Sequence, residues 1–401
     1  MSESAVYEAL VEQLSTRGID AVQIERQVAA LQIETPSWGY ADSGTRFGVF
    51  PQPGRPRNVR EKLEDAAAVH RLTGTAPSVA LHFPWDAVED YTELREQIAS
   101  FGMQVGAINP NLFQDPDYKL GSLTNPDAGI RHKAVEALIY CVEIATKLGA
   151  DAQSLWLADG TSYAGQDDFR ARRKRLEESL AEVYGALPPE QELLVEYKFF
   201  EPAFYSTDLA DWGSALLLCQ QLGPRARVLI DLGHHAQGVN VEQIVTLLAA
   251  SGRLGGFHFN NRKYADDDLI VGSVNPFELF LIFVELGSLP ALPRLTIDQA
   301  HNVEEKLAAM IRSVLNLQEA YAKSLLVDRA ALSEAQLSGD VLGGHELLQD
   351  AFATDVRPLC RAAREQLGAA ADPIAELHAS GLLERRITQR IPDLDLVPQK
   401  G

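Results

Sequence analysis

The stretch RVLIDLGHHAQGVNVEQIVTLLAASGRLGGFHFNN, from Arg227 to Asn261, contains two short apolar runs with a helical pattern between them. The runs RVLID and LGGFHF are apolar almost throughout, which is typical of strands that are covered on both faces of a parallel sheet. The segment VEQIVTLLAA places its apolar residues at helical spacing. This order of strand, helix and strand predicts a parallel βαβ unit.

The same alternation extends in both directions from this stretch. Seven apolar runs lie at 78–85, 104–113, 154–160, 193–200, 227–235, 254–261 and 294–301, and a weaker strand candidate lies around Phe47 to Phe50. Eight such units predict an α/β protein with a (β/α)8 TIM barrel. A doubly wound open sheet is the alternative, but no GxGxxG turn follows the first strand to support it.

The segments on either side of the alternating region have helical patterns. We therefore expect an N-terminal helical segment over residues 1–36, the barrel over residues 37–302, and a C-terminal helical extension over residues 303–401 that takes part in assembly. Apolar faces on these outer helices exceed what the ring of a barrel needs, and this excess favours a homo-oligomer.

Composition limits the partners that this chain can bind. The formal net charge is -20, and no concentrated basic stripe is visible, so the sequence does not favour a nucleic-acid-binding protein. No apolar run reaches the roughly 18 residues that a membrane span needs. The three cysteines are far apart and the first residues do not have the pattern of a secretory signal, so we expect reduced thiols and a cytoplasmic protein.

Polar, aromatic or metal-binding residues follow most of the apolar runs. The carboxyl ends of barrel strands converge on one face, so these side chains are expected to meet there. They are His82 and Trp85, Trp156 and Asp159, Glu196 and Lys198, Asp231 with His234 and His235, His258, and Asp298 with His301.

Five carboxylates would share this face, those of Glu196, Asp231, Asp266, Asp268 and Asp298. Taken singly, each has a simpler explanation, such as a helix cap or a solvated acidic turn. Together they would repel one another, and bound cations relieve such repulsion. The nearby histidines add nitrogen ligands, a mixture that suits Mn²⁺-like or Mg²⁺-like ions, and this many ligands predicts two ions. Asp267 is expected to point away from them.

Several motifs resemble the bacterial L-rhamnose isomerase family in its Pseudomonas-type branch. They include EYKFFEPAFY (196–205), DLGHH (231–235), FHFNNRKYADDD (257–268) and DQAHN (298–302), and the resemblance runs from about Trp38 to Asn302. It implies an aldose–ketose isomerase on a barrel related to xylose isomerase, with two divalent cations per chain. Mn²⁺ is the expected ion, with Co²⁺ and Mg²⁺ as alternatives.

The resemblance also implies residue roles. One ion would be held by Glu196, Asp231, His258 and Asp298, and the second ion by His234, Asp266 and Asp268. Lys198, His234 and Asp298 would act in catalysis, and His82, Trp85 and Trp156 would line the sugar pocket. Phe47 would reach into the pocket of a neighbouring subunit, in an assembly expected to be a tetramer.

The sequence does not decide which sugar is the substrate. L-Rhamnose to L-rhamnulose is the first choice, and D-allose to D-psicose is the second. A single-metal ketose 3-epimerase of the same barrel type is an alternative, although it would need two glutamates across the sugar and only Glu196 lies at a strand end. A non-catalytic sugar-binding homologue is a further alternative, and a metal-dependent endonuclease would need a basic groove.

Overall fold

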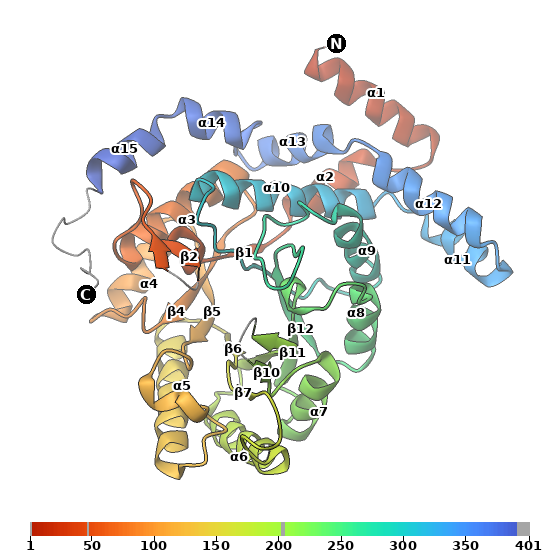
Figure 1. Cartoon of the computed structure of the whole chain (residues 1–401). Helices are drawn as coiled ribbons and strands as arrows, with labels where there is room; N and C mark the ends of the chain where they lie inside the picture. Colours follow the sequence, from red (N-terminus) through yellow and green to blue (C-terminus); the bar gives the residue numbers. More distant parts are fainter. Residues whose placement is uncertain (1, 46–47, 202–204, 391–401) are drawn as a thin grey trace.

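The protein is described here from a computed structural model, which covers residues 2–45, 48–201 and 205–390. Figure 1 shows a ring of strands surrounded by helices, with the helices of the two ends of the chain lying along one side. No helix in these ranges combines the length and the apolar character that crossing a membrane requires.

Eight parallel strands close into a barrel in the order β1-β13-β12-β11-β8-β6-β5-β4, because β1 pairs with both β13 and β4. The (β/α)8 barrel predicted from the alternating pattern is therefore confirmed. The strands are β1 (Ile33–Pro36), β4 (Ser78–Phe83), β5 (Gln104–Pro110), β6 (Ala152–Trp156), β8 (Glu192–Glu196), β11 (Ala226–Asp231), β12 (Leu254–Phe259) and β13 (Arg294–Ile297).

The first barrel strand lies earlier than the sequence pattern indicated. β1 precedes residue 37, where we expected the barrel to begin, and the strand expected around Phe47 is not part of the barrel. Its described residues form β3 (Gly48–Phe50), which pairs antiparallel with β2 (Ser43–Thr45), while Phe47 lies outside the described residues.

Glu34 explains why β1 was missed. Its buried carboxylate lies in the middle of this four-residue strand and accepts hydrogen bonds from Ser78 Oγ at 2.9 Å, from Thr296 Oγ1 at 3.0 Å and from the Ala107 amide at 3.1 Å. These three donors come from β4, β13 and β5. A charged residue in so short a strand breaks the apolar run that marks the other strands, although its partners make its burial acceptable.

The outer ring consists of helices that follow the barrel strands. They are α3 (Val59–Thr73), α4 (Tyr91–Ser100), α5 (Ala128–Leu148), α6 (Phe169–Ala186), α7 (Trp212–Leu222), α8 (Val241–Ala250), α9 (Pro276–Leu286) and α10 (Lys306–Ser324). Asp or Asn side chains cap most of their N-termini; Asp168, for example, accepts from the backbone N–H groups of Arg170 and Ala171 at the start of α6. Apolar side chains of the strands and helices form one large core, and Ala107, Ala152, Leu194 and Leu229 of the barrel strands form a second, small cluster.

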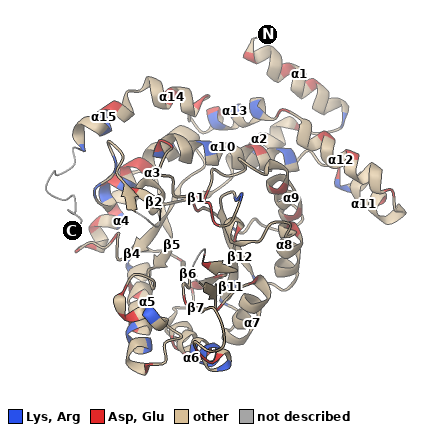
Figure 2. Ribbon diagram, viewed as in Figure 1, with Lys and Arg blue, Asp and Glu red and all other residues tan. Residues whose placement is uncertain are grey.

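Helices from both ends of the chain extend the barrel on one side. They are α1 (Glu3–Thr16), α2 (Ala21–Ala29), α11 (Arg329–Ser338), α12 (Val341–Ala353), α13 (Arg357–Gln366), α14 (Pro373–Ala379) and α15 (Leu382–Gln389). α13 packs against α2, and α14 packs against α10 and α3, so the two ends share one layer. Acidic and basic residues are mixed over the outer helices (Figure 2).

Short strands and single helical turns lie around the mouth of the barrel. A three-stranded sheet contains β7 (Gly160–Thr161), β10 (Tyr205–Thr207) and β9 (Phe200–Glu201), in that order. Single helical turns follow two barrel strands and one loop, as η1 (Ser37–Tyr40), η2 (Pro116–Leu120) and η3 (Leu232–His234). These elements carry several of the side chains that surround the site.

Candidate functional site

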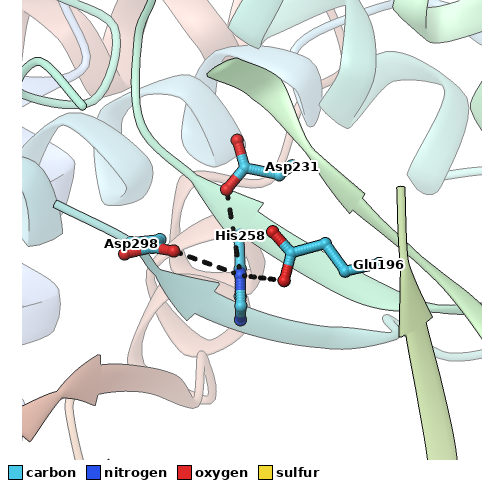
Figure 3. A group of neighbouring side chains, drawn as sticks. All are labelled: Glu196, Asp231, His258 and Asp298. Atoms are coloured by element: carbon cyan, nitrogen blue, oxygen red, sulfur yellow. Dashed lines mark ion pairs between the residues drawn. The ribbon is translucent and has the colours of Figure 1, made fainter. Parts of the chain in front are cut away.

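Four side chains meet at the carboxyl ends of neighbouring barrel strands. Glu196 ends β8, Asp231 ends β11, His258 lies near the end of β12, and Asp298 directly follows β13. One ligand atom from each lies within 4.8 Å of the others (Figure 3). The barrel itself produces this cluster, because parallel strands bring their carboxyl ends to one face.

The spacing of these atoms fits a divalent cation. Nδ1 of His258 lies 3.2 Å from Glu196 Oε2, 3.3 Å from Asp298 Oδ2 and 3.8 Å from Asp231 Oδ2. Ligands about 2.1 Å from one ion are about 3 Å apart when they occupy adjacent positions. Among the described residues, neither His258 Nδ1 nor Asp231 Oδ2 has a hydrogen-bond partner of normal geometry, although both atoms are buried. Buried polar atoms without partners are costly, and a shared cation would satisfy both of them.

Electrostatics lead to the same interpretation. Burial, together with the negative charges of Glu196 and Asp298, raises the pKa of Asp231 to about 7, although His234 and His258 partly offset these effects. Burial opposes protonation of His258, but the Glu196 and Asp298 carboxylates outweigh this effect and raise its pKa well above the usual value. The cluster therefore requires positive charge, which either protons or a metal ion can supply.

A second group of possible ligands adjoins the first. His234 Nε2 lies 2.9 Å from Asp266 Oδ1, and Asp231 completes a set of three atoms within 4.8 Å of one another. The other ring nitrogen, Nδ1, lies 3.0 Å from the Tyr197 carbonyl oxygen, and this contact directs Nε2 toward Asp266. Asp268, expected in this set, lines the same cavity, but Asp231 takes its place in the group of three.

The acidic loop has an unusual backbone conformation. Asp266 and Asp268 have φ angles of 52° and 47°, a left-handed conformation that residues other than glycine rarely adopt. Asp267, between them, accepts the backbone N–H groups of Lys263 and Tyr264 at 2.5 and 2.6 Å. The two outer aspartates thus line the cavity while the middle one caps its own loop.

Asn260, directly after β12, links the two groups of carboxylates. Its Nδ2 donates to Asp231 Oδ1 at 2.9 Å and to Asp268 Oδ1 at 3.3 Å. Burial and the neighbouring Asp266 raise the pKa of Asp268 well above its usual value. Asn260 therefore holds one oxygen of each aspartate in place, as groups behind metal ligands commonly do.

Except for the fully buried Asp231, the residues of the two groups line a cavity of about 240 Å³, one side of which is aromatic. His82 stacks on Trp85 with ring centroids 4.1 Å apart, and Phe113 lies 4.9 Å from Trp156. Burial lowers the pKa of His82 to about 4, so this ring is neutral at pH 7. The cavity thus joins a charged metal-competent side to an apolar, ring-lined side.

Lys198 lies where these two sides meet. Its Nζ is 2.5 Å from Asp266 Oδ2 and 2.8 Å from Glu201 Oε2, and 5.0 Å from the centre of the Trp156 ring. Burial disfavours its charge, but the two carboxylates outweigh burial and raise the pKa of Lys198 above its usual value. The side chain therefore places a fixed ammonium group in the wall of the cavity.

Most of the residues singled out in the sequence line this cavity, and a few lie elsewhere. His235 instead bonds through Nε2 to the Tyr197 hydroxyl at 2.6 Å, and His301 lies 3.5 Å from Glu304. Asp159 is buried in a separate network of hydrogen bonds. Phe47 lies outside the described residues.

Among the lining residues that were missed are Trp38, Asn109 and Phe113. Trp38 donates through Nε1 to Asp298 Oδ1 at 2.8 Å, and so fixes one of the possible ligands. It follows β1 almost directly, and the failure to recognise that strand hid it. The strand-end rule applied to β5 would have found the other two.

Comparisons with known proteins agree with this architecture. The family model described as "Xylose isomerase-like TIM barrel" matches residues 65–280. A probable sugar isomerase of Rhizobium meliloti is 43% identical over 395 residues, covering 96% of this chain and 92% of that protein; a probable sugar isomerase of Mesorhizobium japonicum is 42% identical with the same coverage. A solved structure of L-ribulose 3-epimerase shares the fold with a TM-score of 0.53 at 18% identity, covering 74% of this chain and 98% of that one. The chain therefore belongs to the xylose isomerase-like TIM barrel family.

Proposed function

We propose that the protein is a sugar isomerase that interconverts an aldose and a ketose with the help of divalent cations. The observation that carries the proposal is the cluster of Glu196, Asp231, His258 and Asp298, whose ligand atoms lie within 4.8 Å of one another at the mouth of the barrel. Both curated relatives described above are named as probable sugar isomerases, and each matches nearly the whole chain.

The size and lining of the cavity support a single small sugar as the substrate. About 240 Å³ is slightly below the usual range for small-molecule sites, so the space suits one monosaccharide rather than a chain. Trp85, Trp156 and Phe113 offer ring faces for the C–H groups of a sugar, while His82 and Asn109 offer polar atoms for its hydroxyl groups. Nδ1 of His82 has no protein partner among the described residues and is free to bond a hydroxyl group.

Aldose–ketose isomerisation moves a hydrogen between two adjacent sugar carbons, and both of their oxygens must be polarised. Divalent cations, when bound, supply this Lewis-acid polarisation. We assign one cation to Glu196, Asp231, His258 and Asp298. A second cation would be held by His234 and Asp266 with Asp268 or Asp231.

The chain's own groups then orient and shield the substrate. Lys198 would donate a hydrogen bond to a sugar oxygen that gains negative charge in the transition state. The rings of Trp156 and Phe113 would keep water from the reacting carbons. His234 and Asp298 would act in catalysis as well, Asp298 as a ligand of the first cation and His234 as a ligand of the second.

We further propose L-rhamnose as the first substrate to test and D-allose as the second, with Mn²⁺ as the first metal. The possible ligands are carboxylate oxygens and imidazole nitrogens, so they do not favour a metal that prefers thiolate ligands. The ketose 3-epimerase alternative is less well supported, since Glu196 is the single glutamate that lines the cavity among the described residues.

The test is turnover by metal-stripped protein. EDTA-treated enzyme should be inactive, and adding back Mn²⁺, Co²⁺ or Mg²⁺ should restore conversion of one or more aldoses in a panel that includes L-rhamnose and D-allose. Elemental analysis of the Mn²⁺-loaded protein should approach two ions per chain. A maximum of one ion in active protein, with inversion at C3 of ketoses, would replace the proposal by the epimerase.

A further inference from the structure

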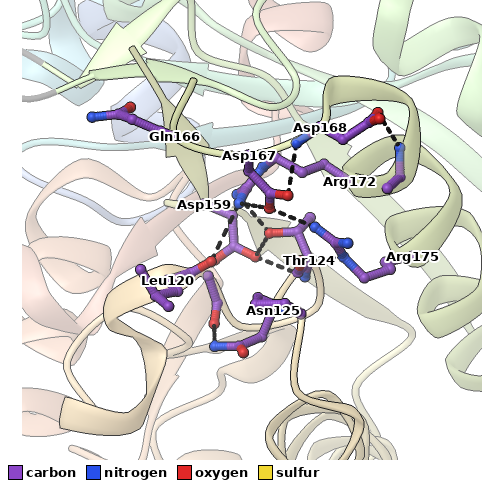
Figure 4. A network of polar contacts seen from close by, with 12 residues as sticks. Leu120, Thr124, Asn125, Asp159, Gln166, Asp167, Asp168, Arg172 and Arg175 are labelled. Carbon is purple, nitrogen blue, oxygen red and sulfur yellow. Dashed lines mark hydrogen bonds and ion pairs between the residues drawn. The ribbon is translucent and has the colours of Figure 1, made fainter. Parts of the chain in front are cut away.

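A buried arginine behind the cavity is bonded to several segments that carry its wall. Arg172 on α6 is 2% exposed, and its guanidinium donates to Thr124, Asp167 and the Leu120 carbonyl oxygen (Figure 4). It also donates to Asp208. It does not line the cavity. The planar fork of an arginine can hold this many partners in fixed directions, which a lysine cannot do.

The bond from Arg172 to Thr124 connects the two segments that carry the aromatic side of the cavity. Thr124 Oγ1 accepts from Arg172 Nη2 at 2.7 Å and donates to Asp159 Oδ2 at 2.6 Å, while Asp159 also accepts the Ser122 amide at 2.7 Å. Thr124 lies in the β5–α5 loop, which begins next to Phe113. Asp159 lies three residues after Trp156 on β6. The network therefore ties together the two segments whose rings touch in the cavity.

The bond from Arg172 to Asp208 connects the network to the backbone of Lys198. Arg172 bonds Asp208 through Nε at 2.9 Å and Nη2 at 2.6 Å. The residues on either side of Asp208 hold the backbone of Lys198, because Leu209 accepts its N–H at 3.0 Å and Thr207 Oγ1 donates to its carbonyl oxygen. A shift of Asp208 would therefore move Lys198.

We propose that Arg172 is a positioning residue that sets Phe113, Trp156 and Lys198 at fixed places relative to one another and so determines how the substrate is held. The four ligands of the first metal group take no bond from this network. Loss of Arg172 should therefore loosen the substrate side of the cavity and leave the first metal group unchanged, whereas Asp266 of the second group is bonded to Lys198 and should be affected with it. The part that concerns turnover rests on the proposed sugar isomerase activity.

The test compares Arg172→Lys with the unaltered protein. The variant keeps the charge but loses the fork, so we expect kcat/KM to fall between about tenfold and a hundredfold, with both a higher KM and a lower kcat, because small displacements of aligned groups have effects of this size. Rates are calculated per bound Mn²⁺, so that a loss of folded protein does not count. Affinity for the ion of the first metal group, held by Glu196, Asp231, His258 and Asp298, should stay within about twofold of the original.

A second variant and a matched control keep the experiment decisive if Arg172→Lys folds poorly. Asp208→Asn removes the charged acceptor at similar size and should show the same direction of change. Arg173→Lys is the control, because Arg173 is the next residue on α6 and bonds Glu177 on its own helix at 2.5 Å. It should leave kcat and KM unchanged.

Amide hydrogen exchange provides a measurement that needs no substrate. In Arg172→Lys the amides of Ser122, Thr124 and Lys198 should exchange at least about tenfold faster, while those of β11 and β12 stay protected. Unchanged exchange at these three amides, with KM and kcat within twofold of the original, would overturn the inference. If the unaltered protein converts no sugar, the proposed function fails, and the exchange result alone decides the role of Arg172.

Discussion

At the scale of single residues, Lys198 offers the sharpest test of the chemistry. Its buried ammonium contacts Asp266 and Glu201 and faces the cavity beside Trp156. Removing a donor that stabilises developing charge costs about 2.7–4 kcal/mol in the transition state. Lys198→Met should therefore lower kcat roughly a hundredfold or more, measured by steady-state kinetics with bound metal quantified in the same samples.

The metal measurement separates this role from a structural one. Asp266 loses its lysine partner in the variant, so its negative charge becomes fully available and metal binding should not weaken. A variant with unchanged kcat would make Lys198 only a partner for its two carboxylates. If the variant loses its metal, Lys198 stabilises the metal site rather than acting in the reaction.

Neighbouring aspartates in the acidic loop should behave very differently from each other. Asp268 lines the cavity and touches Asn260, whereas Asp267 caps the amides of Lys263 and Tyr264. Asp268→Asn should remove most of the turnover while one tightly bound metal ion remains. Asp267→Asn should be nearly silent, because an amide oxygen can accept the same two hydrogen bonds. Calorimetric metal titration and kinetics on both variants provide the check, and equal behaviour of the two would contradict the different roles of Asp267 and Asp268.

At the scale of elements, long apolar strands could be predicted from the sequence and the short polar strand could not. The seven runs from 78 to 301 all contain barrel strands, since a strand covered on both faces must be apolar almost throughout. β1 has four residues and carries Glu34, so nothing local distinguishes it from a loop. Only its partners on β4, β5 and β13 make that strand possible, and these are distant in the sequence.

The site residues, too, divide into those that could be predicted from the sequence and those that could not. Glu196, Asp231, His258 and Asp298 could be found because each lies at or near the end of a recognisable strand. Contacts between loops are set by tertiary packing and leave no local pattern. The bond from Trp38 to Asp298 and the link from Asn260 to two aspartates are of this kind, and neither was foreseen.

The last described helix is attached to the barrel through a buried ion pair. Arg390 follows α15 and bonds both oxygens of Asp65 on α3, at 2.6 and 2.9 Å, and both residues are buried. Burial raises the pKa of Asp65, and Arg390 partly offsets that effect. Removing one partner of a buried pair leaves an uncompensated charge, at a cost of about 3–5 kcal/mol.

Arg390→Met should therefore lower the free energy of unfolding by about 3 kcal/mol, toward the lower end of that range because Arg386 also lies 3.1 Å from Asp65. Denaturant titration measures the change. Arg385→Met on the same exposed helix is the matched control and should cost less than about 1 kcal/mol. If both variants lose the same stability, the ion pair does not anchor α15. Metal content should be unaffected, since Arg390 bonds no residue of the two metal groups.

At the scale of the whole molecule, four of the exposed apolar side chains lie around the mouth of the barrel. Val49 and Phe50 on β3 are 63% and 51% exposed, Tyr264 in the acidic loop is 77% exposed, and Val303 after β13 is 84% exposed. All three segments follow carboxyl ends of barrel strands and so lie on the face that carries the cavity. Exposed apolar surface of this kind is typical of protein–protein contacts.

We propose that a second copy of the chain covers this face, within an assembly expected to be a tetramer, and that Phe47 of the covering copy helps to close the cavity. Phe47→Ala should then damage a neighbour's cavity, whereas Asp266→Asn should damage only its own. When the two variants are co-expressed, some cavities in a mixed oligomer have an intact Asp266 and face an intact Phe47. Activity should therefore exceed the average of the two variants measured separately, in oligomers that native mass spectrometry shows to be mixed. If mixed oligomers show no such recovery, Phe47 acts within its own chain. If mass spectrometry shows a monomer, a second copy does not cover this face.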